Sequence, residues 1–330
     1  MPLRGIASAY LCLLIVWLDL ARGKNANETF KTRAVSVSAS AYGYRRSVRL
    51  PTRGGTINWE LLSPGPAMFN PRHSHATCVF RCPHDYDKQC IWLAGGRSKD
   101  HVAFNLVKTT QNDDVWWSED GALWNRVMIL DGDFLPGAGN ADAKPKGQAA
   151  PWYGRYGYSL DAIDGDGDGV ADVMVLTGGF SPVESNDVWI SRDGANWYFD
   201  GYAPFPPRAY HATAFFRNKL WILGGTPLTN DVWAGTLKED TTKAAGHTMV
   251  WRKKLAHMKT PWFPRAGLCA VTQLRPTPYA NKKAEINDQG GNFTEYLYVI
   301  GGFGGYPRND IRHNGERARN DVWLTTNGVD

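Results

Sequence analysis

A short acidic stretch carries the residue types that bind a hard metal ion. Asp164, Asp166 and Asp168 alternate with glycines, and Asp172 follows four residues after Asp168. Calcium takes about six to eight oxygen ligands in a tight loop, and the backbone carbonyl of Val170 has the position of a further ligand. Carboxylates crowded in this way repel one another unless a cation is present. The stretch therefore predicts a structural calcium site, with a solvated acidic turn as the alternative.

The rest of the chain repeats one block four times. Each copy has an Arg after Pro or Gly, an apolar run, a second apolar run that ends in Gly-Gly, and then Asp-Val-Trp. The arginines are Arg72, Arg155, Arg208 and Arg265; the double glycines lie at 95–96, 178–179, 224–225 and 301–302; the tripeptides begin at Asp114, Asp187, Asp231 and Asp321. A recurring block fixes the architecture before any single motif is interpreted.

The blocks predict an all-β propeller. Each one supplies short β-type runs separated by Gly, Pro, Asn and Asp, and almost nothing has the helical period of about 3.6 residues. Successive arginines are 83, 53 and 57 residues apart. The two shorter spacings match the roughly 40 to 50 residues of one blade, and a Pro- and Gly-rich insertion from Leu130 to Pro151 accounts for the long one. Four blades are therefore visible in the sequence.

The repeated residues have structural roles in this interpretation. Paired glycines permit positive φ at the end of a strand and close approach of the neighbouring chain. We expect each Asp of Asp-Val-Trp to accept hydrogen bonds from loop amides. Because the arginines recur once per block, hydrogen bonding within the fold explains them better than a catalytic cluster does.

The double glycine after an apolar strand, followed by Asn-Asp-Val-Trp as at 186–189 and by a further Trp, resembles the kelch repeat from about residue 58 onward. The resemblance implies a kelch-like β-propeller whose loops bind partners, and it does not imply catalysis. Trp59 has the spacing of an outer strand, so the segment 56–62 is able to complete the fourth block. A closed four-bladed ring and a part of a larger propeller both fit the repeats.

The acidic stretch belongs to the second block. It replaces the short hairpin at Arg217 and Asn218 of the third block, so it should join two adjacent strands of one sheet. It resembles the calcium hairpins of integrin-type propellers. An EF-hand is disfavoured because Val175 stands at the position of the bidentate Glu.

Two further resemblances keep an enzyme as the alternative. The segments 118–124 and 191–197 are similar to the Asp-box hairpin of sialidases, in which Asp and Ser cap a tight turn far from catalysis. Arg208-Ala209-Tyr210-His211 resembles part of the copper-binding segment of galactose-oxidase-type propellers, and His73 and His75 lie in the first block. A copper radical site also needs a second Tyr and another His, which the blocks do not offer together. We therefore expect no catalytic residues, with a copper oxidase or a sialidase-like glycosidase as the alternative.

The N-terminus has the pattern of a secretory signal peptide, with Arg4 before an apolar run and small residues near Gly23. The sequence predicts removal of residues 1–23, an N-terminal segment at 24–55 and a propeller at 56–330. The apolar run is short for a bilayer span of about 20 residues. No later run is longer, so no membrane span is expected after cleavage.

Cysteine usage fits an oxidising compartment, because removal of Cys12 leaves an even number. Cys82 and Cys90 bracket a short turn between two apolar runs, which predicts a disulfide between them. Cys78 and Cys269 fit two buried thiols as well as a second bridge.

Charge and loops define the expected partners. The chain has 37 Lys and Arg against 32 Asp and Glu, spread along its length, so it lacks the basic stripe that nucleic-acid binding requires. Sequons predict glycosylation at Asn27 and Asn292. The insertions 99–112, 130–151 and 276–292 are candidates for a binding surface, because loops vary at little cost to a rigid ring. We expect a secreted, non-enzymatic propeller that binds protein or glycan.

Overall fold

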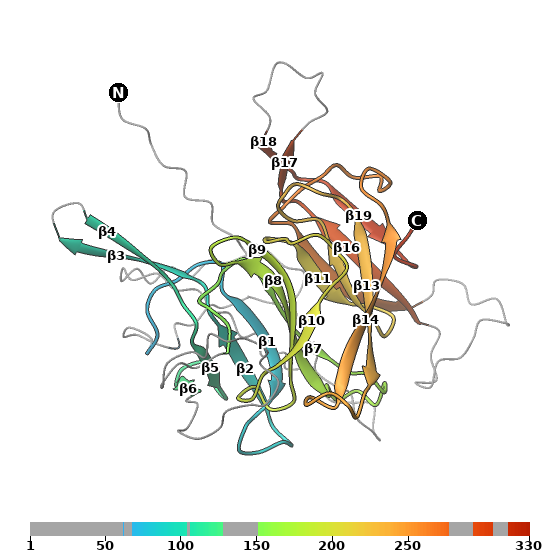
Figure 1. The fold of residues 1–330 in the computed structure, drawn as a ribbon. Coiled ribbons are helices and arrows are strands. Elements are labelled where there is room, and N and C mark those ends of the chain that lie inside the picture. Colours follow the sequence, from blue (N-terminus) through green and yellow to red (C-terminus); the bar gives the residue numbers. More distant parts are fainter. Residues whose placement is uncertain (1–61, 63–67, 104–105, 128–150, 277–292, 306–315) are drawn as a thin grey trace, which may run out of the picture.

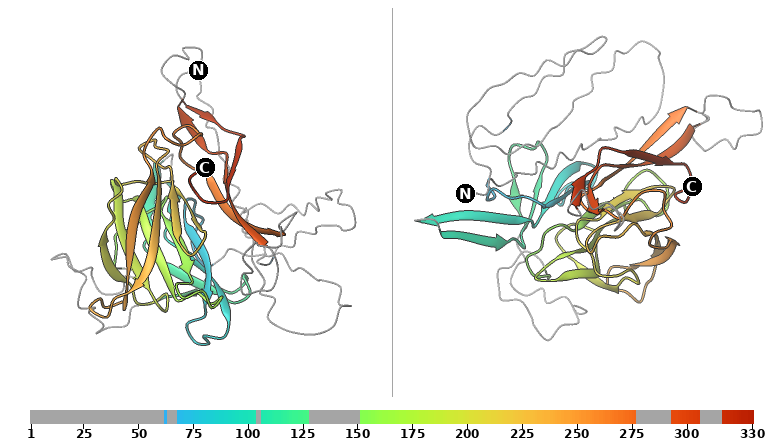
Figure 2. Two further views of the ribbon diagram at one scale, coloured as in Figure 1. Left: turned by 90° about the vertical axis from the view of Figure 1, so that its right-hand side faces the viewer. Right: turned by 90° about the horizontal axis from the view of Figure 1, so that it is seen from above.

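The computed structural model describes residues 62, 68–103, 106–127, 151–276, 293–305 and 316–330. All regular secondary structure in these ranges is β, and the strands form sheets around a common axis (Figures 1 and 2). No helix in the described ranges has the length and apolarity of a membrane span. The predicted all-β propeller with four blades is confirmed.

The blades are antiparallel meanders, in which strands that follow one another in a blade are paired. Blade 1 contains β1 (Ala76–Arg81), β2 (Gln89–Ala94), β5 (Val115–Ser118) and β6 (Asn125–Arg126). Blade 2 contains β7 (Ser159–Ile163), β8 (Val173–Phe180), β9 (Glu184–Ser191) and β10 (Tyr198–Tyr202). Blade 3 contains β11 (Ala212–Phe215), β12 (Leu220–Leu223), β13 (Val232–Glu239) and β14 (His247–Leu255). Blade 4 contains β15 (Cys269–Pro276), β16 (Phe293–Ile300) and β19 (Val322–Thr325).

Two hairpin ribbons leave the blades after a double glycine. The first, β3 (Arg97–Ala103) with β4 (Leu106–Gln111), belongs to blade 1 and projects away from the sheets (Figure 1). The second, β17 (Phe303–Gly305) with β18 (Glu316–Ala318), belongs to blade 4. The first strands of the blades lie side by side, with β1 against β7, β7 against β11, and β11 against β15.

The repeated Arg and Asp of each block form an ion pair inside its blade, which is largely buried in blades 1, 2 and 3 and partly exposed at Asp321 in blade 4. In blade 2 the Nη1 and Nη2 groups of Arg155 each donate to one carboxylate oxygen of Asp187 at 2.7 Å. The same Nη1 donates to the carbonyl of Gly178 at 2.9 Å, and Trp189 Nε1 donates to Asp187 Oδ2 at 2.7 Å. The same set recurs as Arg72–Asp114–Trp116, Arg208–Asp231–Trp233 and Arg265–Asp321–Trp323. The expectation that loop amides are the donors to these aspartates is thus wrong, because the main donors are guanidinium and indole groups, with a hydroxyl from Ser185 in blade 2 and from Thr229 in blade 3.

Aromatic rings pack around this ion pair in the same way in successive blades. Trp152, three residues before Arg155, meets Trp189 and Trp197 with ring centroids 5.7 and 5.0 Å apart. Equivalent trios are Phe69, Trp116 and Trp124 in blade 1, and Phe205, Trp233 and Trp251 in blade 3. The rings cover the guanidinium and exclude water from the pair, which strengthens its electrostatic attraction.

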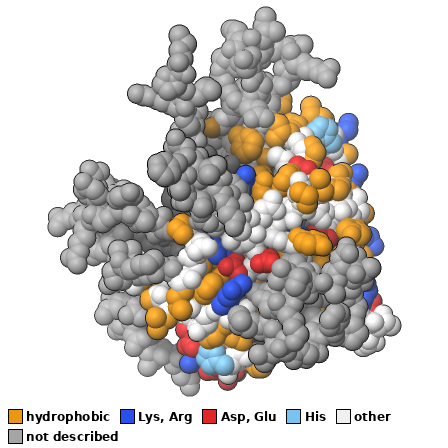
Figure 3. Space-filling model, turned by 60° about the vertical axis from the view of Figure 1, so that its left-hand side comes forward, with side chains coloured by type: hydrophobic (Ala, Val, Ile, Leu, Met, Phe, Trp, Pro, Cys, Tyr) orange, Lys and Arg blue, Asp and Glu red, His pale blue; other side chains and the backbone are white. Residues whose placement is uncertain are grey.

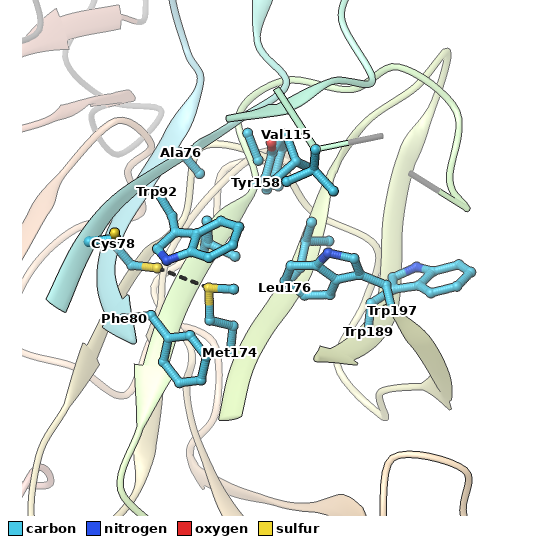
Figure 4. Close-up of a cluster of buried hydrophobic side chains, with 14 of the residues drawn as sticks. Ala76, Cys78, Phe80, Trp92, Val115, Tyr158, Met174, Leu176, Trp189 and Trp197 are labelled. Carbon is cyan, nitrogen blue, oxygen red and sulfur yellow. Dashed lines mark hydrogen bonds between the residues drawn. The ribbon is translucent and has the colours of Figure 1, made fainter. Parts of the chain in front are cut away.

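The core lies between the blades. Figure 4 shows the cluster between blades 1 and 2, in which Cys78 and Trp92 of blade 1 face Met174 and Leu176 of blade 2. Similar clusters fill the spaces between blades 2 and 3 and between blades 3 and 4. Blades 2 and 3 therefore bury both faces of their sheets because each has a neighbour on both sides.

The double glycines join one blade to the next. Gly178 and Gly179 have φ values of 65° and 98°, and a Cβ on Gly178 would lie 2.8 Å from the carbonyl oxygen of Arg208. Three junctions share one backbone hydrogen bond, from Gly96 to Arg155, from Gly179 to Arg208 and from Gly225 to Arg265, at 2.9, 2.8 and 2.8 Å. Within the described residues Gly302 makes no such bond to Arg72, so blades 4 and 1 are not joined in this way. Trp59 and the rest of the segment 56–61 lie outside the described residues, and Leu62 is described as an exposed residue.

The cysteine predictions are resolved in part. Cys82 and Cys90 form the expected disulfide at the β1–β2 hairpin. Cys78 and Cys269 do not bridge each other, and the Cys78 thiol lies 3.4 Å from the Met174 sulfur. The glycosylation sites Asn27 and Asn292, the signal peptide and the N-terminal segment lie outside the described residues.

Removal of one carboxylate from the buried pairs should destabilise the fold strongly. We predict that Asp231→Ala lowers the free energy of unfolding by about 3–5 kcal/mol, because it leaves the buried Arg208 guanidinium without its counter-charge. Urea unfolding measures the change. Asp85→Ala, which removes an exposed partner of Lys88, is the control and should cost less than about 1 kcal/mol. Equal losses in the two variants would contradict a structural role for the repeated pair.

Candidate functional site

The acidic loop connects β7 to β8 in blade 2, at the end of the sheet opposite the double glycine. Blade 3 has a tight turn between Phe216 and Lys219 at the equivalent place. The prediction that the loop joins two adjacent strands of one sheet is therefore confirmed.

The loop brings most of its carboxylates together. Asp164, Asp166 and Asp172 each place one carboxylate oxygen within 4.8 Å of the others. Asp168, also a predicted ligand, is outside this group, and its Oδ1 accepts the backbone N–H of Val170 at 2.7 Å. The structure thus provides three of the four predicted carboxylates at one point.

Hydrogen bonds inside the loop hold these carboxylates inward. Asp164 accepts the backbone N–H groups of Gly167 and Gly169 at 2.6 and 2.8 Å. Asp172 Oδ2 accepts the N–H of Gly165 at 2.7 Å. These bonds leave further lone pairs on every carboxylate, so the same oxygens are able to bind a cation.

The charge of the loop is only partly compensated by the protein. Burial raises the pKa of Asp164, and the negative charges of Asp168 and Asp166 raise it further. Arg81 of blade 1 approaches from the side, but its Nη2 donates to the Ala171 carbonyl rather than to a carboxylate. An all-oxygen donor set of this kind suits Ca²⁺ or Mg²⁺ rather than a metal that prefers nitrogen or sulfur ligands.

The His211 segment does not form a metal centre in the described structure. The imidazole is buried between blades 2 and 3, with Nε2 3.3 Å from Thr177 Oγ1. Burial, and then the nearby Arg208 charge, lower the pKa of His211 to about 3. Among the described residues, only the acidic loop groups three or more His, Cys, Asp or Glu side chains at a distance that suits an ion. The copper ligands of the oxidase alternative are therefore not brought together there.

The Asp-box-like hairpins are turn caps. In blade 2, Asp193 Oδ1 accepts the N–H groups of Ala195 and Asn196, and Ser191 Oγ accepts that of Gly194. Trp197 Nε1 donates back to the Gly194 carbonyl at 2.9 Å. The hairpin at 118–124 repeats these bonds. Their polar groups are thus used in holding the turn between the third and fourth strands of a blade.

Comparison with known proteins adds a structural similarity only. No protein-family model matches the chain, and no curated protein matches it. Among solved structures, the chain is similar to one titled "Structure of YjhT", with 15% sequence identity and a TM-score of 0.45. The match covers 78% of this chain and 69% of that chain. The blades and junctions described above define the class, a four-bladed β-propeller arrangement.

The buried imidazole of His211 should make stability fall in mild acid. Its folded-state pKa of about 3 lies below the ordinary 6.5, so the unfolded chain binds a proton that the folded chain excludes. Stability from this residue is full above pH 6.5 and declines as the pH falls toward 3. Asp161, whose pKa burial raises to about 6, acts in the opposite direction.

We predict that His211→Leu weakens the loss of stability between pH 6.5 and 4, since blade 4 accommodates Leu268 at the equivalent position. Urea midpoints measured across this range provide the test. The exposed His257→Leu is the control and should keep the wild-type slope. An unchanged slope in His211→Leu would mean that the imidazole is accessible to protons in the folded state.

Proposed function

We propose that this chain is a secreted, non-enzymatic, kelch-type propeller that binds a protein or a glycan through loops at one face. The main support for the proposal is that the repeated polar residues make their hydrogen bonds within the fold. Every repeated arginine is held by an aspartate and a glycine carbonyl of its own blade. A guanidinium engaged in this way has little capacity left to bind a substrate.

The binding face is assigned to the end of the blades that carries the double glycines. The ribbon β3–β4 covers most of the predicted insertion 99–112, and β17–β18 extends from blade 4 after the equivalent glycines. The insertion 130–151 lies almost wholly outside the described residues, and so does 276–292 beyond Pro276. Hairpins on a rigid frame suit recognition because they change without disturbing the core.

The charge distribution favours a protein or glycan over a nucleic acid. On the face drawn in Figure 3, the coloured Lys and Arg side chains are interspersed with Asp and Glu rather than gathered in one stripe. A nucleic-acid surface concentrates positive charge along the path of the phosphates. The disulfide between Cys82 and Cys90 is compatible with secretion, because such bonds persist in oxidising compartments.

Calcium is assigned a structural role at the β7–β8 loop, whose Asp-Gly-Asp-Gly-Asp-Gly sequence at 164–169 resembles the calcium hairpins of integrin-type propellers. Asp164, Asp166 and Asp172 would hold the ion, with the Val170 carbonyl as an additional ligand. The loop contacts blade 1 through Arg81 and lies close to Leu237 of blade 3. An ion that stiffens the loop would therefore stabilise contacts among blades 1, 2 and 3.

We predict that calorimetric titration detects Ca²⁺ binding to the wild type and that Asp166→Ala abolishes it. Asp168→Ala should weaken binding less, because its carboxylate lies outside the group formed by the other three. Asp87→Ala, in the neighbouring hairpin of blade 1, is the matched acidic control and should bind as the wild type does. Identical isotherms for the wild type and Asp166→Ala would remove the calcium assignment.

The binding role is tested by shortening the β3–β4 ribbon. We predict that the purified mature chain binds a member of a glycan array or of an extracellular protein panel, and that replacing residues 99–109 by a two-residue Gly turn abolishes this binding. The thermal midpoint should be unchanged, because the ribbon projects from blade 1 (Figure 1). Copper-dependent oxidation of sugars, or hydrolysis of sialosides, by the same preparation would support the enzyme alternative instead.

A further inference from the structure

One face of blade 4 exposes side chains that the other blades bury. The Val of Asp-Val-Trp is 1%, 2% and 2% exposed in the first three blades, at Val115, Val188 and Val232. Its equivalent in blade 4, Val322, is 61% exposed. Leu324, two residues on, is 55% exposed. Because these residues alternate along β19, they lie on the same face of the sheet.

Strand β16 adds to the same exposed face. Tyr298 lies three residues before the double glycine, where blades 1 and 3 have the buried Trp92 and Trp221. Its hydroxyl is buried but has no hydrogen-bond partner. Ile300, next on this face, is also exposed. An apolar patch of this kind on a folded sheet marks an interaction surface.

The formed junctions show what covers this face elsewhere in the molecule. Val115 lies in one cluster with Leu160 and Trp189 of blade 2. Val188 lies in one cluster with Trp233 of blade 3. This face is therefore covered by the face of the next blade that carries the tryptophan of Asp-Val-Trp, which we call the leading face. The next blade also contributes its first strand and the carbonyl of its repeated Arg.

Blade 1 presents such a leading face without a partner blade. Leu93, Trp116 and Trp124, with Phe69 and Ile91, form a separate cluster that contains no residue of another blade among those described. The Arg72 carbonyl receives no bond from a double glycine, whereas its equivalents in blades 2, 3 and 4 do. Among the described residues, these two unmatched faces are both apolar, and each carries one half of the hydrogen bond that joins the other blades.

We propose that blade 4 docks on blade 1 of a second copy of this chain, head to tail, and repeats the junction found between the other blades. The second copy is favoured because its blade 1 presents the same kind of face, with Leu93, Trp116 and the Arg72 carbonyl, that covers the equivalent residues at the three formed junctions. In the proposed contact Gly302 N–H donates to the Arg72 carbonyl of the second copy, and Val322 and Leu324 pack beside its Trp116. A head-to-tail contact of this type gives a closed ring if its rotation closes and an open filament if it does not.

The test measures molar mass by light scattering after size exclusion, over a hundredfold range of concentration. We expect the wild type to have at least twice the mass of one chain and to dissociate on dilution. The double variant Val322→Asp/Leu324→Asp should be a monomer with a similar thermal midpoint, because both residues are exposed in the single copy. Val183→Asp, at an exposed valine of blade 2, is the matched control and should keep the wild-type mass.

Cross-linking identifies which blade 1 is bound. Cys78 and Met174 touch across the junction of blades 1 and 2, and the equivalent positions at the proposed contact are Val271 and Ile91. In Val271→Cys/Ile91→Cys, oxidation should join two chains, whereas Met174→Cys should bridge to Cys78 within one chain. A disulfide within one chain of the first variant, a wild type that is monomeric at every concentration, or an oligomer unaffected by Val322→Asp/Leu324→Asp would each overturn the proposal.

Discussion

The bidentate ion pair between an arginine at the entry of each blade and the aspartate before its third strand is the interaction on which the rest of the structure depends. A buried guanidinium needs acceptors for its N–H groups. In blade 2, the acceptors for Arg155 are the Asp187 carboxylate and the Gly178 carbonyl. The pair therefore ties the entry segment to the second and third strands at once. The carbonyl of the same kind of arginine, Arg208 in blade 3, accepts the bond from Gly179, so one residue organises a blade and joins it to its neighbour.

This arrangement limits where function can lie. The arginines, aspartates and tryptophans that recur once per blade are used in hydrogen bonds that hold the blades together. The low pKa of the buried His211 imidazole keeps it neutral. The side chains that remain available for binding lie in segments that differ between blades, namely the acidic β7–β8 loop and the two hairpin ribbons. An interaction module with a stiffened loop follows from this division more directly than an enzyme does.

The sequence predicted the parts of the fold that depend on local pattern, and it missed those that depend on geometry between strands. Gly-Gly at a strand end adopts positive φ, and Cys82 reaches Cys90 because it lies two residues beyond Phe80, the strand partner of Cys90. The partner of each repeated aspartate lies in a distant part of its block, and the sequence pattern predicted loop amides as the donors to the aspartates instead. The joint recurrence of Arg and Asp is the signal that could have found the pair. Asp168 lies outside the group of the other carboxylates, and its Oδ1 accepts the N–H of Val170, a local bond that the spacing of the aspartates did not predict.

Native-state hydrogen exchange of the tryptophan indole N–H groups, followed by NMR, tests the central role of the ion pair most directly. Trp189 and Trp233 donate to the paired aspartates, whereas the buried Trp152 and Trp251 nitrogens have no acceptor among the described residues. The account predicts that the first two exchange only when the whole domain unfolds, and that the other two exchange faster through local opening. Equal exchange rates for all four indole N–H groups, well above the rate of global unfolding, would show that the fold does not depend on the Arg–Asp ion pairs.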